Sequence, residues 1–321
     1  MTSKNEQPTA PAQLSIRPVY GIMEAEAVSD LQAAAWGFSD RDLIPAHSLI
    51  AIQKSGGAVI GAYRTTVSPR RRTEAAQLVG FALGWTGLRG GKAFHYSDML
   101  AVLPEYQQHN IGYLLKLSQR EAVMAQGLEL MAWTYDPLVA RNAWFNIVKL
   151  GCTAKEYTLN LYGELHSATH SGLPTDRFTA DWALRSARVV GRVGRPLSEQ
   201  LRSFNEQVNW QQPPRRSTPP DEEPFQLQDH QLVTATSLHA EGYRLLDQID
   251  LDTPLGMVWA EIPADIDKIR NHDPEAALHW RMQTRALFQH YFGRGYFVTG
   301  MVRSRFAGER RVFYQLEMTT V

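Results

Sequence analysis

The stretch from Met99 to Ala122 holds the residues best suited to chemistry. An apolar strand ends at Pro104, a short polar loop follows, and a helix begins near Gly112. The free N–H groups of a helix's first turn, together with the helix dipole, attract anions, and a diphosphate is a common biological occupant. A small residue such as Gly112 lets a phosphate approach the backbone closely. The segment therefore predicts a diphosphate site at the start of this helix.

This loop resembles one in the Gcn5-related N-acetyltransferase (GNAT) superfamily, where the fourth strand runs into the pattern Arg/Gln-x-x-Gly-x-Gly/Ala. Gln107 and Gly112 match the pattern, and Asn110 replaces its first glycine. Asparagine adopts left-handed backbone angles more readily than most residues, so we expect the loop to keep its conformation. The resemblance covers residues 14–163, where the order of predicted strands and helices follows that of the family.

The resemblance implies that acyl-CoA is the co-substrate. The backbone of Leu100, Ala101 and Val102 would pair with the pantetheine arm as an added strand does, while the loop amides would hold the diphosphate. An amide near Leu100 could stabilise the oxyanion that forms when an amine attacks the thioester. The loop residues assigned to the diphosphate are Gln107, Gln108, His109, Asn110, Ile111, Gly112 and Tyr113.

Direct transfer also needs a base that takes a proton from the amine. The family often places a carboxylate on its fourth strand, where this chain has Asp98, with His95 three residues earlier. Strand alternation directs Asp98 and His95 to opposite sides, so at most one of them faces the substrate. The alternative for both is an ordinary polar role at the edge of the strand.

An acid that assists the leaving thiolate is harder to place. The family often has a tyrosine where this chain has Ile147, so Tyr135, at the end of the fifth strand, or Tyr106 could substitute, although such aromatics more often pack. Asn142 and Asn146 have i, i+4 spacing on the next helix and would share one face, from which they could bond the pantetheine amides. Capping or a surface position is the alternative for the asparagines.

Hydrophobic periodicity predicts the elements that position these residues. A hairpin precedes two adjoining strand-helix-strand units, so antiparallel and parallel pairing should both occur. We therefore expect an α/β (α+β) fold with a mixed, mostly antiparallel twisted sheet flanked by helices. The predicted strands are 14–21, 58–64, 76–87, 95–104, 128–137 and 152–163, and the predicted helices are 22–38, 42–55, 111–125 and 138–151.

Composition divides the chain into four parts. The expected parts are a disordered lead-in at 1–13, a GNAT acyltransferase domain at 14–186, a connecting segment at 187–253 with a Pro-rich linker at 211–224, and a C-terminal α/β extension at 254–321. The extension should contain three strands and one long helix. Segments 136–151 and 173–182, with IPADIDKI and WRMQTRALF near the C-terminus, resemble a less characterised branch of predicted acyltransferases, which implies that the extension belongs to that branch.

Charge and cysteine content exclude several classes of function. Lys plus Arg and Asp plus Glu number 33 each in 321 residues, so no overall field directs the chain to nucleic acid or to an anionic membrane. The single Cys152 excludes an internal disulfide framework and fits a reducing compartment. No apolar run approaches the roughly 20 residues that span a bilayer. We expect a soluble, cytoplasmic protein without a metal.

Two further patterns carry weaker alternatives. His166 and His170 have the spacing of a helical metal pair but lack the glutamate of zinc peptidases. The Arg70 to Arg72 run, and a second arginine cluster, could contact the 3′-phosphate of CoA, an acidic substrate or RNA, but solvated charge suits a neutral chain better. The second cluster is Arg185, Arg188, Arg192 and Arg195.

These patterns favour an acyl-CoA-dependent N-acyltransferase that moves an acetyl or succinyl group to a primary amine of a small molecule, such as an amino acid. The main alternative is a CoA-binding regulatory or scaffold protein without turnover, and nucleic-acid binding through the arginines is the third hypothesis. The expected partners are acyl-CoA and the amine, and a homodimer is left open.

Overall fold

The structure of the chain, a computed structural model, describes residues 12–39, 41–67, 74–163, 172–212, 231–306 and 309–318. The chain divides into two compact units, each formed by two stretches of sequence. Unit 1 comprises Met1–Met131 and Gly194–Ser217, and unit 2 comprises Ala132–Val193 and Thr218–Val321. Predictions that lie outside the described residues concern 1–11 of the lead-in, 213–224 of the linker, Arg70 to Arg72, His166 and His170.

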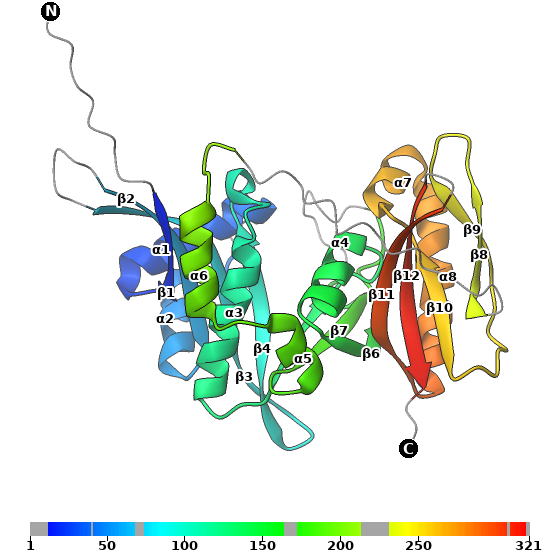
Figure 1. Cartoon of the computed structure of the whole chain (residues 1–321), viewed down its shortest axis with the longest axis horizontal. Helices are drawn as coiled ribbons and strands as arrows, with labels where there is room; N and C mark the ends of the chain where they lie inside the picture. Colours follow the sequence, from blue (N-terminus) through cyan, green and yellow to red (C-terminus); the bar gives the residue numbers. More distant parts are fainter. Residues whose placement is uncertain are drawn as a thin grey trace, which may run out of the picture. The chain divides into compact units, whose positions relative to one another are not determined.

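Unit 1 is built on four antiparallel strands in the order β1-β2-β3-β4 (Figure 1). The strands are β1 (Gln13–Pro18), β2 (Ala58–Val67), β3 (Glu74–Arg89) and β4 (Lys92–Val102). The helices are α1 (Gly21–Trp36), α2 (Ala46–Lys54), α3 (Ile111–Ala125) and α6 (Leu197–Gln207), and a short 3-10 turn, η1 (Pro104–Tyr106), follows β4.

Helices cover both faces of the unit 1 sheet. On one face, Ala101 of β4 is buried in an apolar core with residues of α1 and α2, and Met99 packs against the same core. On the other face, Leu100 and Val102 lie beside Gly112 of α3. Because side chains alternate along β4, the strand packs against α1 and α2 on one face and against the start of α3 on the other.

Unit 2 contains a second set of strands, in the order β5-β7-β6-β11-β12-β10, and a separate two-stranded sheet, β8-β9. The strands are β5 (Leu130–Tyr135), which enters unit 2 at Ala132, β6 (Thr153–Thr158), β7 (Arg177–Ala183), β8 (Thr234–Leu238), β9 (Arg244–Ile249), β10 (Met257–Ile262), β11 (Tyr296–Phe306) and β12 (Glu309–Met318). The helices are α4 (Ala140–Ala143), which continues as the π-helix η2 (Trp144–Lys149), α5 (Ala187–Val193), α7 (Ile266–His272) and α8 (Pro274–Gly293).

The core of unit 2 is aromatic. The Phe178 ring of β7 meets the Phe288 ring of α8 edge-on, with ring centroids 4.7 Å apart, and Tyr314 of β12 packs against both rings. Trp280 and Tyr291 of α8 are also buried. Helix α8 therefore packs with β7 and β12 in one aromatic core.

The fold class is confirmed, because antiparallel pairing predominates, Leu232 and Trp259 form an isolated parallel bridge, and helices flank the strands. The compact units, however, follow different boundaries from the predicted domains. Strand β11 pairs with β6 through Val298 and Ala154, so the C-terminal strands extend a sheet that begins inside the predicted acyltransferase domain. Within the predicted connecting segment 187–253, the described residues form α5, α6, β8 and β9.

Candidate functional site

The predicted diphosphate loop connects β4 to α3 through the turn η1. Gln108 and Asn110 have left-handed backbone angles, with φ of 73° and 66°. The angle of Asn110 agrees with the sequence prediction, whereas nothing in the sequence pointed to Gln108. A left-handed angle costs a non-glycine residue roughly 1 to 2 kcal/mol, so two such residues around His109 persist only where their surroundings hold them.

Four amides of this loop remain open. The amide of Gln107 donates to Pro104 O at 3.2 Å, and the amide of Tyr113 donates to Asn110 O at 3.1 Å. By contrast, no acceptor among the described residues bonds the amides of Gln108, His109, Ile111 and Gly112. Backbone N–H groups gathered where left-handed residues interrupt the chain, at the first turn of a helix of 15 residues, form an anion-binding concavity.

The strand before the loop carries a β-bulge at Asp98. The pairing of β3 with β4 passes from Leu83 opposite Met99 to Gly84 opposite Ser97, so Asp98 has no partner of its own. A bulge twists the strand and redirects the side chain of the extra residue. The Asp98 side chain reaches solvent, while its neighbours Ser97 and Met99 face the interior.

The surroundings of Asp98 suit a base. Although the carboxyl group reaches solvent, nearby protein atoms displace part of its hydration, and this desolvation raises the pKa of Asp98. A carboxylate with a raised pKa holds a proton more strongly and is a better proton acceptor than an ordinary aspartate. Asp98 is thus an ionisable side chain of β4 that a ligand could reach.

His95 lies in a different environment from Asp98. The ring is fully buried, and burial, followed by the charge of Lys116, lowers the pKa of His95 to about 4. Gln119 Nε2 donates to His95 Nε2 at 3.2 Å, since Gln119 Oε1 is used by other donors. The imidazole is therefore neutral, buried and hydrogen-bonded to Gln119. Asp98 remains as the candidate base.

A buried polar cluster joins β4 to α3 beneath the bulge. Lys116 Nζ donates to Ser97 Oγ at 2.7 Å, and Ser97 Oγ donates to Gln119 Oε1 at 2.8 Å. All three side chains are at most 3% exposed. Gly84 completes the arrangement, because a Cβ at this position would lie 2.3 Å from His95 Nε2. The cluster fixes the register of α3 against the bulged strand.

Tyr135, Asn142 and Asn146 lie in unit 2. The Tyr135 side chain is buried, and burial raises the pKa of its hydroxyl far above the ordinary value. A phenol in such a site can donate a hydrogen bond, but it gives up its proton poorly. The hydroxyl lies beside that of Tyr314, which donates to Pro137 O at 2.9 Å.

The two asparagines differ in exposure. Asn142 is exposed on α4, whereas Asn146 is 3% exposed and its Oδ1 accepts from Trp133 Nε1 at 3.1 Å. The spacing predicted a shared face, but the two side chains differ in exposure, and after Ala143 the helix continues as a π-helix. Ile147, which stands where the family often has a tyrosine, is fully buried.

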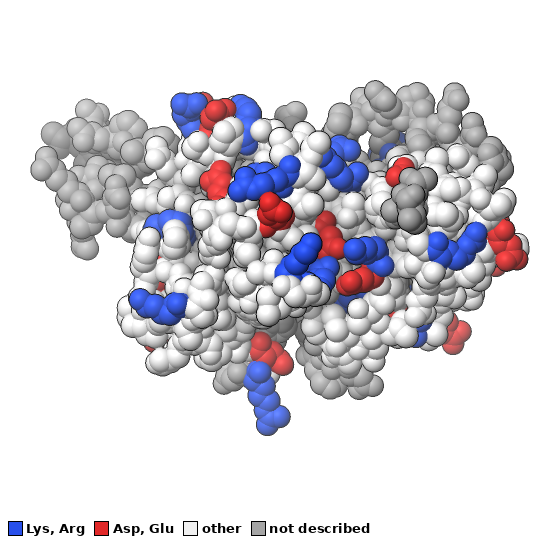
Figure 2. Space-filling model, turned by 90° about the horizontal axis from the view of Figure 1, so that it is seen from below, with Lys and Arg blue, Asp and Glu red and all other residues white. Residues whose placement is uncertain are grey.

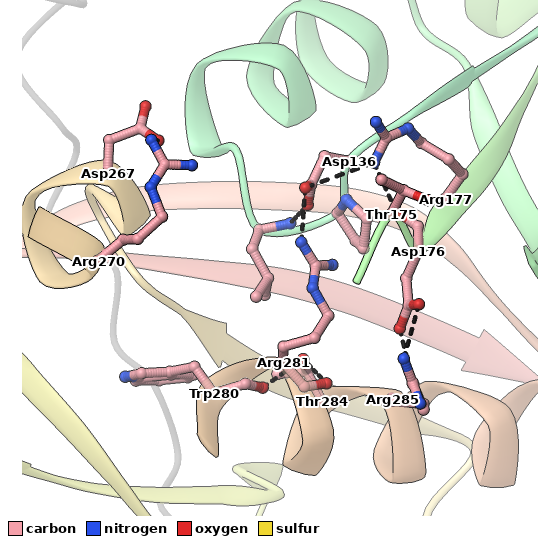
Figure 3. A network of polar contacts seen from close by, with 12 residues as sticks. Asp136, Thr175, Asp176, Arg177, Asp267, Arg270, Trp280, Arg281, Thr284 and Arg285 are labelled. Atoms are coloured by element: carbon pink, nitrogen blue, oxygen red, sulfur yellow. Dashed lines mark hydrogen bonds and ion pairs between the residues drawn. The ribbon is translucent and has the colours of Figure 1, made fainter. Parts of the chain in front are cut away.

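Asp136, the residue after Tyr135, belongs to an ion-pair network that no sequence pattern indicated (Figure 3). Asp136 accepts from Arg281 Nη2 at 2.5 Å and from the Leu138 amide at 2.8 Å, with Arg177 Nη1 at 3.6 Å. Arg281 Nε and Nη1 have no partner among the described residues, but both atoms are buried, so no ligand atom reaches them as the side chains stand.

Asp176 forms the other half of the network. The two oxygens of Asp176 accept from Arg285 Nε and Nη2, both at 2.8 Å, and one of them also accepts from the Tyr157 hydroxyl at 2.8 Å. Burial alone would raise the pKa of Asp176, but these donors and the Asn160 amide lower it below the ordinary value. The bonds hold α8 to β7.

The predicted site residues therefore fall into two groups. Unit 1 contains the candidate base Asp98, the strand residues Leu100, Ala101 and Val102, and the loop from Gln107 to Tyr113, whereas unit 2 contains the other three. Among the described residues, no three His, Cys, Asp or Glu side chains form a metal-binding group. The same part of the chain contains no helix that is long and apolar enough to cross a membrane.

The fold of this chain is similar to those of several solved structures. No family model and no curated protein matches the sequence. A ribosomal-protein-S18-alanine N-acetyltransferase from Escherichia coli is similar over 55% of this chain and 96% of its own, with 14% identity and a TM-score of 0.40. A GNAT family acetyltransferase from Elizabethkingia anophelis with acetyl-CoA bound is similar over 53% of this chain and 98% of its own, with 14% identity and a TM-score of 0.37.

Proposed function

We propose that this chain is an acyl-CoA-dependent N-acyltransferase. The observation that carries the proposal is the set of open amides at Gln108, His109, Ile111 and Gly112, at the first turn of α3. These amides follow a strand and lie in a loop whose sequence resembles the diphosphate loop of GNAT enzymes. A diphosphate is the ligand that such a turn suits best.

The residues of unit 1 supply separate parts of the reaction. The open loop amides would bind the diphosphate of acyl-CoA, and the backbone of Leu100, Ala101 and Val102 would align the pantetheine arm as an added strand. Asp98, presented by the bulge, would take the proton from the amine as it attacks the thioester carbon. A backbone amide near Leu100 would stabilise the tetrahedral oxyanion until the thiolate leaves.

The proposed acyl group is acetyl or succinyl, and the proposed acceptor is a primary amine of a small molecule. Tyr135 stays the candidate acid from the sequence, but its hydroxyl is buried and would have to become exposed before it could donate to a leaving thiolate. Asn142 is the exposed asparagine that could bond a pantetheine amide, while Asn146 would first have to release Trp133. The proposal thus depends least on the residues of unit 2.

A thermal-shift screen against acetyl-CoA, succinyl-CoA and free CoA tests binding, because a ligand of the native state raises the melting temperature. Thiol release is then measured with a panel of amino acids, small amines and one peptide with a free amino terminus. Turnover with a small amine supports the acceptor class, whereas turnover only with the peptide replaces it by a protein acceptor. No binding of any acyl-CoA contradicts the proposal.

A CoA-binding regulatory or scaffold protein is the second candidate function, favoured by Ile147 at the place of the family's tyrosine. Tight binding of acyl-CoA without thiol release from any amine would support it. Among the described residues on the face in Figure 2, basic and acidic side chains are interspersed.

A further inference from the structure

The chain returns to unit 1 after a passage through unit 2. Residues 194–212, here called the strap, contain α6 and Trp210 and belong to unit 1, although residues 132–193 before them belong to unit 2. The strap is fastened along β1, where Asn205 Oδ1 accepts from the Leu14 amide at 2.7 Å and Asn205 Nδ2 donates to Leu14 O at 2.9 Å. Trp210 Nε1 donates to Ala12 O at 2.6 Å.

The end of the strap packs against the candidate diphosphate loop. The Trp210 indole stacks on the His109 ring, with centroids 5.6 Å apart and planes inclined by 26°. Tyr106, just before the loop, meets the same indole edge-on at 5.7 Å, and the Arg64 guanidinium lies 5.4 Å from its centre. His109 is only 4% exposed as a result.

The position of His109 gives this packing a consequence for the loop. His109 lies between Gln108 and Asn110, the two residues with left-handed angles, and its own amide is among the open ones. Strained backbone persists only where neighbouring contacts determine it. Side-chain contacts of the loop include the His109 stack, a hydrogen bond of 3.2 Å from Gln107 Nε2 to Val102 O, and a contact of 3.3 Å between His109 Nδ1 and Gln107 O.

We propose that the strap, through Trp210, is the positioning device that holds the diphosphate loop in its ligand-ready conformation. The inference rests on the proposed function, since it assigns Trp210 to the same site. Trp210 acts through His109 and contacts the loop from outside. Preorganisation of this kind improves affinity by reducing the cost of ordering the site on binding.

The test compares three variants of the full chain. Trp210→Ala removes the stack, Trp210→Phe keeps an aromatic face, and Trp36→Ala is the matched control, because it removes an indole from unit 1 that packs against Phe38 and Phe81. Acetyl-CoA affinity is measured by calorimetry, and KM and kcat by thiol release. Hydrogen exchange of the Tyr113 and Leu114 amides, both bonded to Asn110 O, is measured without ligand.

We expect Trp210→Ala to weaken acetyl-CoA binding and raise KM about tenfold, with kcat changed far less, because several aromatic contacts are lost. The Tyr113 and Leu114 amides should exchange faster in this variant, while Trp210→Phe restores most of both properties. A Trp36→Ala variant that reproduces these effects, or unchanged exchange and affinity in Trp210→Ala, overturns the inference. If the unaltered chain binds no acyl-CoA, the proposed function fails, and the exchange data alone still decide whether the strap holds the loop.

Discussion

The diphosphate loop of unit 1 and the ion-pair network of unit 2 are both rich in polar groups, but they use them in opposite ways. In the loop, four N–H donors stay open, and two residues keep costly backbone angles. In the network, the carboxylates of Asp136 and Asp176 are occupied by arginines and amides. The loop is arranged to receive a partner, whereas the network holds the fold together.

The largest expected effect comes from Asp98→Asn, which removes the candidate base on β4, the strand that leads into the loop. We expect kcat to fall by about 10² to 10⁴, a typical contribution of a general base. Because desolvation raises the pKa of Asp98, activity of the unaltered chain should increase with pH as this carboxyl group loses its proton. Thiol release measured from pH 4 to 8 checks both points. Unchanged kcat in Asp98→Asn would remove Asp98 from the mechanism.

Loss of a contact in the ion-pair network should lower the stability of the fold. Asp176→Ala leaves Arg285 and Tyr157 without their acceptor, and the loss of one partner of a buried pair lowers the free energy of unfolding by about 3 to 5 kcal/mol. Urea denaturation measures this loss. The folded fraction should bind acetyl-CoA with unchanged affinity, and a stable variant that has lost only acyl-CoA binding would contradict the assignment of Asp176 to the fold.

His95 should make a smaller contribution to the free energy of unfolding, and this contribution depends on pH. Its pKa is about 4 in the folded protein against 6.5 ordinarily, so the unfolded chain binds more protons between these values. The contribution of His95 to stability is therefore complete above about pH 6.5 and declines as pH falls, reaching a loss of about 3 kcal/mol near pH 4. Urea denaturation of His95→Gln and of the unaltered chain over this range isolates the effect. Parallel pH curves would contradict it.

The sequence predicts the elements of unit 1 better than the details of the site. Helix α3 has the predicted bounds because its apolar spacing and the preceding loop both mark where it begins. The bulge at Asp98 could not be foreseen, since it depends on how β3 and β4 pair around Gly84. The left-handed angle of Gln108 likewise depends on packing from Trp210, 102 residues later in the sequence.

Unit 2 shows the same limit over longer distances. Asp136 lies beside Tyr135 in the sequence, yet its partner Arg281 is 145 residues away, and periodicity gives no sign of the pair. The predicted helix 138–151 is interrupted by a π-helix, which moves Asn146 against Trp133. Predictions that rested on local spacing therefore hold where one helix packs regularly, and they fail where distant segments determine a side chain's position.

The smallest expected effect comes from a substitution at Gly112, where the loop meets α3. Gly112→Val adds a side chain at the first turn of α3, where a Cβ would meet Leu100 Cδ2 at an ordinary 3.7 Å, so the helix should still form. The added bulk keeps a phosphate from the amides and should weaken acetyl-CoA binding about tenfold or more, equivalent to about 1.4 kcal/mol. Gly191→Val in α5, where no atom lies within 4 Å, is the matched control. Equal affinities in the two variants would contradict the role of Gly112.

The central claim is that the open amides at the start of α3 bind a diphosphate. Amide chemical shifts of the full chain, followed by NMR during titration with CoA, test it directly. The account predicts the largest changes at Gln108, His109, Ile111 and Gly112, with small changes at the ion-pair network around Asp176. Binding of CoA that leaves these four amides unshifted, or the absence of binding, would contradict the account.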